Sequence, residues 1–286
     1  MKRLALLLAA MGIVSAAAFA EAPTLKVTNI GQTIEIENTS GNEDIGDAFW
    51  FFNNVGMTYD NWTFGLQAGK MWTVDTEDGF GSTNSRLQLS GVRNYGNYYL
   101  GLKTRMTKTY DRYHALAGWN YDNLYGDFDV WYQANESAAD EVHYEIFPIG
   151  VKIGGFKAAW FVEGWEAVGS VTNGQQESYM AHQLRFYAPL YTGEKLSLTT
   201  EYRLSLTEDK EYKEKAPKAY TTFKDGGRHR LYVRSNYNVT DNLSVFLNYG
   251  YQISKYEGHN ETKTDRAKVD SDKYWGDVEF GWNYKF

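Results

Sequence analysis

The sequence predicts an all-β protein, a transmembrane antiparallel up-and-down β-barrel of fourteen strands with both termini on the periplasmic side. Three observations predict this fold. Segments of about ten to thirteen residues alternate between apolar and polar side chains. Their connections alternate between tight turns and longer polar loops, and an export signal precedes them.

The export signal is expected to be residues 1–20. Met1-Lys2-Arg3 forms a short basic head, residues 4–19 form an apolar run, and Ala18-Phe19-Ala20 resembles a cleavage site. The run is shorter than the roughly 20 residues that a membrane-spanning helix needs, and no stop-transfer pattern follows it. We therefore expect a cleaved signal peptide, with residues 21–286 forming the barrel.

The composition excludes several classes of function. The chain has no cysteine, so disulfides and thiolate chemistry are ruled out. Without Lys2 and Arg3, 27 basic residues face 36 acidic ones, a net charge near −9, so the basic footprint of nucleic-acid binding is missing. The sequence has neither metal-ligand spacing nor a glycine-rich phosphate loop, so we expect no metal and no cofactor. After residue 20 no stretch approaches 18 apolar residues, and a membrane-embedded form would have to be a closed barrel.

The alternation is strict in the last thirteen residues. One face carries seven mostly aromatic or apolar residues, namely Tyr274, Gly276, Val278, Phe280, Trp282, Tyr284 and Phe286. The residues between them are mostly polar, which is typical of a strand with one apolar and one wet face. Similar runs begin near Trp62, Arg86, Tyr98, Tyr113, Leu124, Val142, Phe156, Tyr179, Leu196, Leu231 and Leu243.

The connections between these runs are of two kinds. Six are tight and lie at Asp60-Asn61, Tyr95-Gly96-Asn97, Asp122-Asn123, Gly154-Gly155, residues 190–195 and Thr240-Asp241-Asn242. Seven are longer and polar, at residues 38–45, 75–84, 108–112, 135–140, 169–176, 208–226 and 257–271. Together they join fourteen strands, the first at about residues 25–37. The alternation of apolar and polar residues changes phase at Phe147-Pro148. A soluble β-sandwich is the alternative, but it would need neither such long strands nor this loop asymmetry.

Five ordered segments resemble the monomeric outer membrane porin G family. They are Ile34-Glu35-Ile36-Glu37-Asn38, Val92 to Tyr99, Leu184-Arg185-Phe186-Tyr187-Ala188-Pro189-Leu190, Asn242-Leu243-Ser244-Val245, and the end of the chain from Ser271 to Phe286. The resemblance implies a fourteen-stranded, single-chain, weakly selective pore for mono- and oligosaccharides and other small hydrophilic solutes. It also implies a lipopolysaccharide-containing outer membrane around the barrel, and Phe286 as the signal for the barrel-assembly machinery.

The period of two also predicts which charged residues face inward and line the pore. The basic ones are Lys103, Arg105, Lys157, Arg185, Arg203, Arg230 and Arg234. The acidic ones are Glu35, Asp127, Asp129, Glu163, Glu201, Asp277 and Glu279. Fourteen strands should leave a channel unless loops plug it. These charges either brace the wall across strands or form a track for solute, and inward aromatics such as Trp131 and Tyr232 either stack on sugar rings or pack the wall.

The longest predicted loop, residues 208–226, is a candidate gate. In the porin G family the loop at this position folds over the pore. Here it carries Lys213, Lys215 and Tyr220 among mixed charges, which suit either a gate or a solvated loop.

In the family, acid closure is associated with two histidines on the neighbouring strands that flank this loop, which repel each other when protonated. This sequence has His229 and His259, which are also thirty residues apart. A hairpin centred near Asp241 places Ile253 opposite His229, so His259 should lie roughly 20 Å further along the strand. A pH gate is therefore a hypothesis that rests on sequence spacing alone.

Three rival classes of function are an enzyme, an oligosaccharide-specific channel and a loop-presenting adhesin. An enzyme is not expected, because His114, His143 and His182 lie on different predicted strands without a recognisable catalytic constellation. The short early loops favour a monomer over a trimer.

Overall fold

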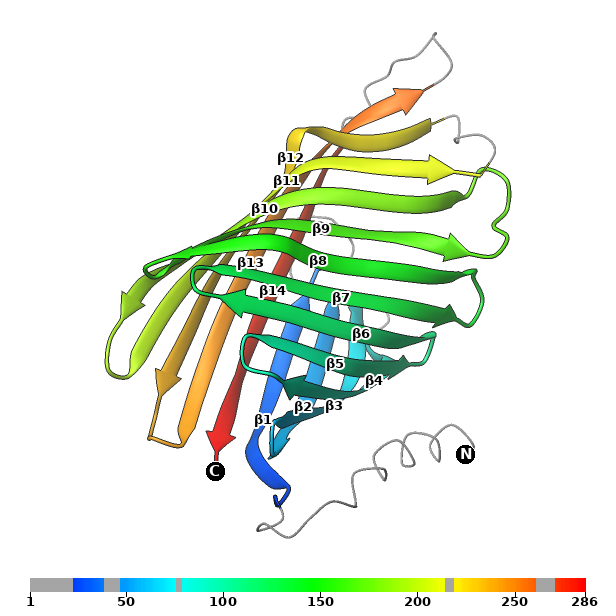
Figure 1. Cartoon of the computed structure of the whole chain (residues 1–286). Helices are drawn as coiled ribbons and strands as arrows, with labels where there is room; N and C mark the ends of the chain where they lie inside the picture. Colours follow the sequence, from blue (N-terminus) through cyan, green and yellow to red (C-terminus); the bar gives the residue numbers. More distant parts are fainter. Residues whose placement is uncertain (1–22, 39–46, 76–78, 214–218, 261–270) are drawn as a thin grey trace.

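The computed structural model describes residues 23–38, 47–75, 79–213, 219–260 and 271–286. These residues form fourteen antiparallel strands in one closed barrel, with β1 paired to β14, so the predicted fold is confirmed (Figure 1). The strands are β1 (Lys26–Glu37), β2 (Ala48–Tyr59), β3 (Trp62–Asp75), β4 (Gly79–Asn94), β5 (Tyr98–Thr107), β6 (Tyr110–Tyr121), β7 (Leu124–Asn135), β8 (Asp140–Ile153), β9 (Phe156–Val168), β10 (Gln176–Thr192), β11 (Leu196–Tyr212), β12 (Ala219–Asn238), β13 (Leu243–Asn260) and β14 (Ser271–Lys285). None of these residues belongs to a helix long and apolar enough to cross a membrane.

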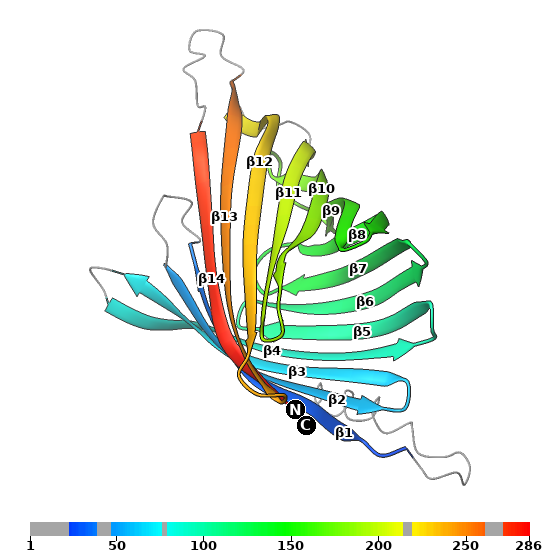
Figure 2. The same cartoon turned by 90° about the vertical axis from the view of Figure 1, so that its left-hand side faces the viewer.

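The tight turns, the start of β1 and the end of β14 share one rim of the barrel. The hairpins turn where predicted, and Asp60 and Asp122 have positive φ angles of 51° and 49°, which aspartate tolerates better than most residues. At the same rim the amide of Phe286 donates to the carbonyl of Thr28 at 3.0 Å. In Figure 2, β1 runs past the end of β14 at this rim, since Asn29 pairs with Lys285 and β1 begins three residues earlier.

At the opposite rim, which carries the longer loops, several strands are longer than the sequence predicted. The predicted loop 208–226 is wrong in extent, because β11 continues to Tyr212 and β12 begins at Ala219. Strand residues also occupy part of the predicted loops 75–84, 108–112 and 257–271. The sequence of these segments is mostly polar or glycine, so it lacks the apolar alternation by which the other strands were recognised.

Above the middle of the barrel, β11 and β12 separate. Their last paired residues toward the loop rim are Ser205 and Arg228. Beyond this point β11 continues beside β10, and β12 bulges and pairs with β13 again from Phe223 onward. Gly226, at a φ of +57°, supplies the left-handed conformation that this bulge needs. In Figure 1, β12 bends sharply near its upper end.

The phase change at Phe147-Pro148 is a β-bulge in β8. Pairing with β9 breaks between Ile146 and Ile149, and pairing with β7 shifts at the same level. Proline has no amide hydrogen to donate to a ladder, so a bulge is one of the few places where a sheet accepts it. The bulge corrects the phase of the alternation, so Val142 before it and Ile149 and Ile153 after it all lie exposed on the outer face.

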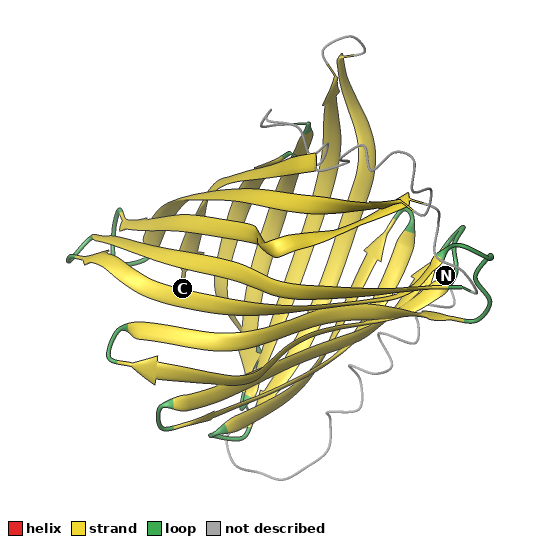
Figure 3. Cartoon of the chain, turned by 90° about the horizontal axis from the view of Figure 1, so that it is seen from above, coloured by secondary structure: helices red, strands yellow, loops and turns green. Residues whose placement is uncertain are grey.

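The outer face of the barrel is apolar and exposed. Leu102, Leu247 and Leu231 lie within strands and expose 69%, 55% and 49% of their surface. Soluble monomers rarely expose contiguous apolar surface on this scale, whereas a lipid-facing band requires it. Tyr98, Tyr121, Tyr132 and Tyr284 lie exposed near strand ends, as an aromatic girdle would. Seen from above, the strands form one continuous wall (Figure 3).

On the inner face, aromatic rings lie on glycines of the next strand. Tyr99 faces Gly118 across β5 and β6, and Tyr232 faces Gly250 across β12 and β13. A Cβ atom added at either glycine would come within 2.5 Å of the ring opposite. Glycine is therefore the residue that lets these rings lie flat against the wall.

Candidate functional site: the inner face of the barrel

The inner face is identified by ion pairs that skip strands. Arg228 on β12 contacts Glu163 on β9, and Lys103 on β5 contacts Asp129 on β7 at 2.6 Å. Such contacts pass over the intervening strands on the inside of a closed wall. The cross-strand registers place all fourteen charged residues predicted to face inward on this face. They are Glu35, Lys103, Arg105, Asp127, Asp129, Lys157, Glu163, Arg185, Glu201, Arg203, Arg230, Arg234, Asp277 and Glu279.

Five arginines on β10, β11 and β12 form what we call the basic wall: Arg185, Arg203, Arg228, Arg230 and Arg234. The registers align three of them, since Arg203 lies opposite both Arg185 and Arg230. Glu201 is held between Arg203 and Arg234, each at 2.5 Å from a different carboxylate oxygen. The five guanidinium groups outnumber Glu163 and Glu201, so the wall has a net positive charge.

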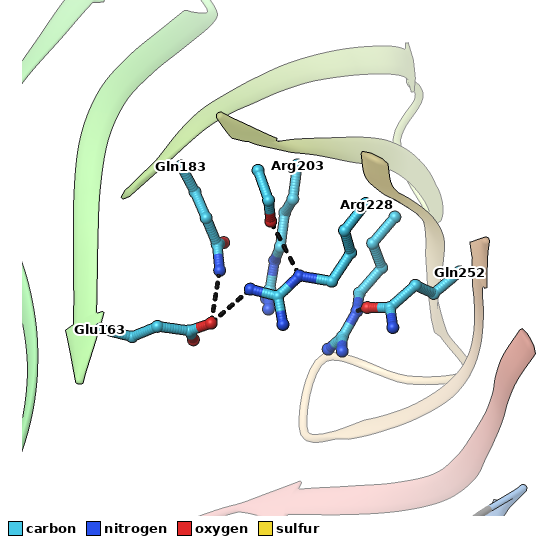
Figure 4. A pocket seen from close by; sticks show the side chains of 7 residues that line it. Glu163, Gln183, Arg203, Arg228 and Gln252 are labelled. Carbon is cyan, nitrogen blue, oxygen red and sulfur yellow. Dashed lines mark hydrogen bonds and ion pairs between the residues drawn. The ribbon is translucent and has the colours of Figure 1, made fainter. Parts of the chain in front are cut away.

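The basic wall encloses a small polar hollow of about 30 Å³ (Figure 4). Arg228 crosses it to reach Glu163, which also accepts a hydrogen bond from Gln183 at 2.8 Å. The Nε atom of Arg228 donates to Ser205 at 2.8 Å, directly below the point where β11 and β12 separate. The hollow is about the size of one water molecule, which is too small for a sugar. The groups around it therefore brace the wall.

Aromatic rings underlie the arginines of the inner face. The Arg185 guanidinium carbon lies 3.3 Å from the centroid of Phe161, and that of Arg234 lies 4.4 Å from Tyr232. Phe161 and Tyr232 are buried as a result, as is Trp131. Of the two roles considered for inward aromatics, these three pack the wall, and charged and amide groups present the surface toward the lumen.

A second polar cluster joins β5, β6 and β7. Asp129 accepts hydrogen bonds from Lys103 and the Nδ1 atom of His114, both at 2.6 Å, while the Tyr99 hydroxyl donates to Asp127 at 2.6 Å. The three histidines lie on different strands, as expected, but two of them share an aromatic partner. His114 and His143 stack on opposite faces of Trp131, with centroids 5.0 Å away in each case. Sequence spacing concealed this contact because the three rings lie on three strands.

Four acidic residues on β1 and β14 form what we call the acidic seam. Glu35 lies opposite Glu279, and Glu37 lies opposite Asp277, where the first and last strands close the barrel. Glu35 and Glu279 also line an open hollow of about 520 Å³, together with residues of β2, β3, β4, β5 and β13. Arg86 and Arg105 line the same hollow, whereas the basic wall lies on β10, β11 and β12.

Three further arginines of the inner face were not predicted from the sequence, namely Arg86, Arg112 and Arg228. Arg112 and Arg228 lie within or next to predicted loops, where no inward direction could be assigned. Arg86 opens a predicted strand, and its guanidinium lies 4.4 Å from Trp50 and 4.9 Å from Phe52. Extending the alternation backward from Arg230 would have found Arg228.

The candidate gate residues lie apart. Lys213 pairs with the exposed Glu177 at 3.6 Å, and Lys215 lies outside the described residues. His229 pairs with Ile253, which confirms the predicted register, and His259 pairs with Tyr220 six residues further along β13. His229 is exposed on the outer face, where the Tyr202 hydroxyl lies 2.7 Å from its Nδ1 atom. The backbone register thus separates the two histidines instead of pairing them.

Solved structures of outer-membrane barrels resemble this chain. A bacterial polysaccharide outer membrane secretin is 9% identical, with a TM-score of 0.52 over 90% of this chain and 98% of the secretin. OmpT of Vibrio cholerae is 11% identical, with a TM-score of 0.48 over 94% and 100% of the two chains. An anion-selective porin from Comamonas acidovorans is 11% identical, with a TM-score of 0.45 over 92% and 100%. No family model and no curated protein matches the chain.

These identities concern the fold alone. The chain has the closed fourteen-stranded fold of an outer-membrane β-barrel. None of the comparisons singles out the porin G family that the five sequence segments resemble.

Proposed function

We propose that the protein is an outer-membrane porin, a water-filled and weakly selective channel through which small hydrophilic solutes, including mono- and oligosaccharides, diffuse passively. The observation that carries the proposal is the division between the two faces of the wall. Exposed leucines, valines and aromatics cover the outside, while fourteen predicted charged residues and several amides face the inside. A charged inner face is stable only where water or counter-charges reach it.

The same division supports the expected location and orientation. The barrel lies in a lipopolysaccharide-containing outer membrane, after export by a cleaved signal peptide, and the barrel-assembly machinery recognises Phe286. The start of β1 and the end of β14 share the rim of tight turns, which is the periplasmic rim of outer-membrane barrels. The barrel acts as a monomer.

Liposome swelling with sugars of graded size tests the channel. We expect vesicles that contain the purified barrel to swell in monosaccharides and more slowly in larger sugars. Vesicles that admit no sugar would indicate a plugged barrel, as a loop-presenting adhesin would be. The pair between His114 and Asp129 does not favour an enzyme, because the Nε2 atom of His114 is buried without a hydrogen-bond partner among the described residues.

A channel specific for oligosaccharides is the second candidate, and the basic wall favours it. Five arginines with only two paired carboxylates would attract sugars that carry carboxylates, since guanidinium binds carboxylate through two parallel hydrogen bonds. Swelling in a uronic acid disaccharide, compared with a neutral disaccharide of the same size, distinguishes the two candidates. A general porin admits both at similar rates, whereas a specific channel prefers the acidic sugar.

A further inference from the structure

We propose that the acidic seam holds a divalent cation, bound by Glu35, Asp277 and Glu279. One carboxylate oxygen of each residue lies within 4.8 Å of those of the other two. The three side chains come from the two strands that close the barrel, β1 and β14. The cation would therefore connect the first strand of the barrel to the last.

Asp277 provides the observation that points to a ligand. It is only 6% exposed, and its Oδ1 atom is buried without a hydrogen-bond partner. Its carboxylate belongs to the group that converges with Glu35 and Glu279. A buried carboxylate oxygen that lacks a donor is costly, and a cation at the centre of the three carboxylates would satisfy it.

The like charges of the seam also need a counter-ion. Glu35 and Glu279 lie directly opposite each other, as do Glu37 and Asp277. Like charges at opposed positions of neighbouring strands destabilise a sheet. Glu37 accepts a hydrogen bond from Trp275 at 3.3 Å, and Glu279 accepts one from Asn248 at 2.8 Å, but neutral donors do not balance the charge.

The nearby arginines are engaged elsewhere. The Arg86 guanidinium lies on Trp50 and Phe52, and that of Arg230 lies 4.2 Å from Trp275. Arg230 also donates to Gln252 at 2.7 Å, and Arg105, which lines the same hollow, donates to Gln88 at 3.0 Å. Among the described residues, none of these three arginines forms an ion pair within 4.0 Å of the three converging carboxylates. The seam therefore retains negative charge that a mobile cation can neutralise.

The donor set indicates the kind of ion. Three carboxylates offer hard oxygen ligands and no nitrogen or sulfur, which suits calcium or magnesium. Calcium accepts six to eight oxygens in flexible geometry, and water from the open hollow beside Glu35 and Glu279 can complete its shell. Magnesium demands a stricter octahedron, so we expect calcium to bind more tightly. Extracellular calcium sites have dissociation constants of about 10⁻⁴ to 10⁻³ M.

Calcium titration of the purified barrel, free of lipopolysaccharide, tests the site. Isothermal titration calorimetry should find one calcium per chain, and the midpoint of thermal unfolding should rise in calcium relative to EDTA. Asp277→Asn should weaken binding at least tenfold and abolish the calcium-dependent rise. Glu145→Gln is the matched control, because Glu145 is an inward carboxylate on β8, on the opposite side of the ring of strands. It should leave the affinity within twofold of the unmodified protein.

Terbium supplies a readout that does not depend on the stability of a variant. Trp50 lies opposite Glu35 on β2, and Trp275 lies two residues before Asp277, so excitation of tryptophan should sensitise terbium emission that calcium quenches by displacement. Emission should fall at least tenfold in Asp277→Asn or Glu279→Gln and persist in Glu145→Gln. Absence of calcium binding by the unmodified barrel, or equal affinity in Asp277→Asn, would overturn the proposal.

Discussion

Replacing Glu163 by glutamine should destabilise the barrel and make it more selective for anions. Glu163 and Arg228 join β9 to β12, and their side chains are only 22% and 17% exposed. Removing one partner of a fully buried pair costs about 3–5 kcal/mol. The pair lies beside a wet lumen, and Gln183 remains as a partner for the new amide, so we expect a loss of about 2–3 kcal/mol.

A double-mutant cycle with Arg228→Gln, measured by urea unfolding in lipid vesicles, isolates the pair. The coupling energy should be at least about 1 kcal/mol. In a KCl gradient, the reversal potential should shift in the direction of anion selectivity in Glu163→Gln and in the direction of cation selectivity in Arg228→Gln. Glu177→Gln is the control, because the pair of Glu177 with Lys213 is long and exposed and should contribute about 1 kcal/mol or less. If the two substitutions add within about 0.5 kcal/mol, Arg228 does not brace the wall through Glu163.

Three further predictions concern the outer face, the wall and assembly. Leu102→Arg should cost about 2–4 kcal/mol in vesicles, because Leu102 is 69% exposed at the middle of β5; an unchanged unfolding free energy would place this face in water. Gly118→Val should cost about 1–3 kcal/mol and weaken the contact of Tyr99 with Asp127, whereas Gly81→Val, which meets no atom within 4 Å, should change the unfolding free energy by less than about 0.5 kcal/mol. Phe286→Ala should lower the amount of heat-modifiable barrel in outer membranes while refolding from urea proceeds normally; equal amounts of barrel would exclude Phe286 as the assembly signal.

The sequence predicted the wall better than the contacts across it. A period of two fixes which side of a strand a residue faces, so the direction of Glu201 or Arg203 follows from its neighbours alone. The tight turns at Asp60-Asn61 and Asp122-Asn123 were predictable because their residues favour the required backbone angles. The upper parts of β11 and β12 were not, since their sequence is mostly polar and shows no regular apolar period.

The period of two could not predict contacts between strands that are far apart in the sequence. The stack of His114, Trp131 and His143 and the convergence of Glu35 with Asp277 depend on register and barrel curvature. Register between hairpin strands can be counted from a turn, as the pairing of His229 with Ile253 illustrates. The register between β1 and β14 has no connecting turn, so the acidic seam could be recognised only in the closed barrel.

Single-channel recording of the purified protein in a planar lipid bilayer tests the proposed open pore most directly. We expect each insertion to add one conductance level, with weak ion selectivity that shifts in opposite directions in Glu163→Gln and Arg228→Gln. Closure in three equal steps would contradict a monomer. Insertion of folded protein without any conductance would contradict a water-filled channel.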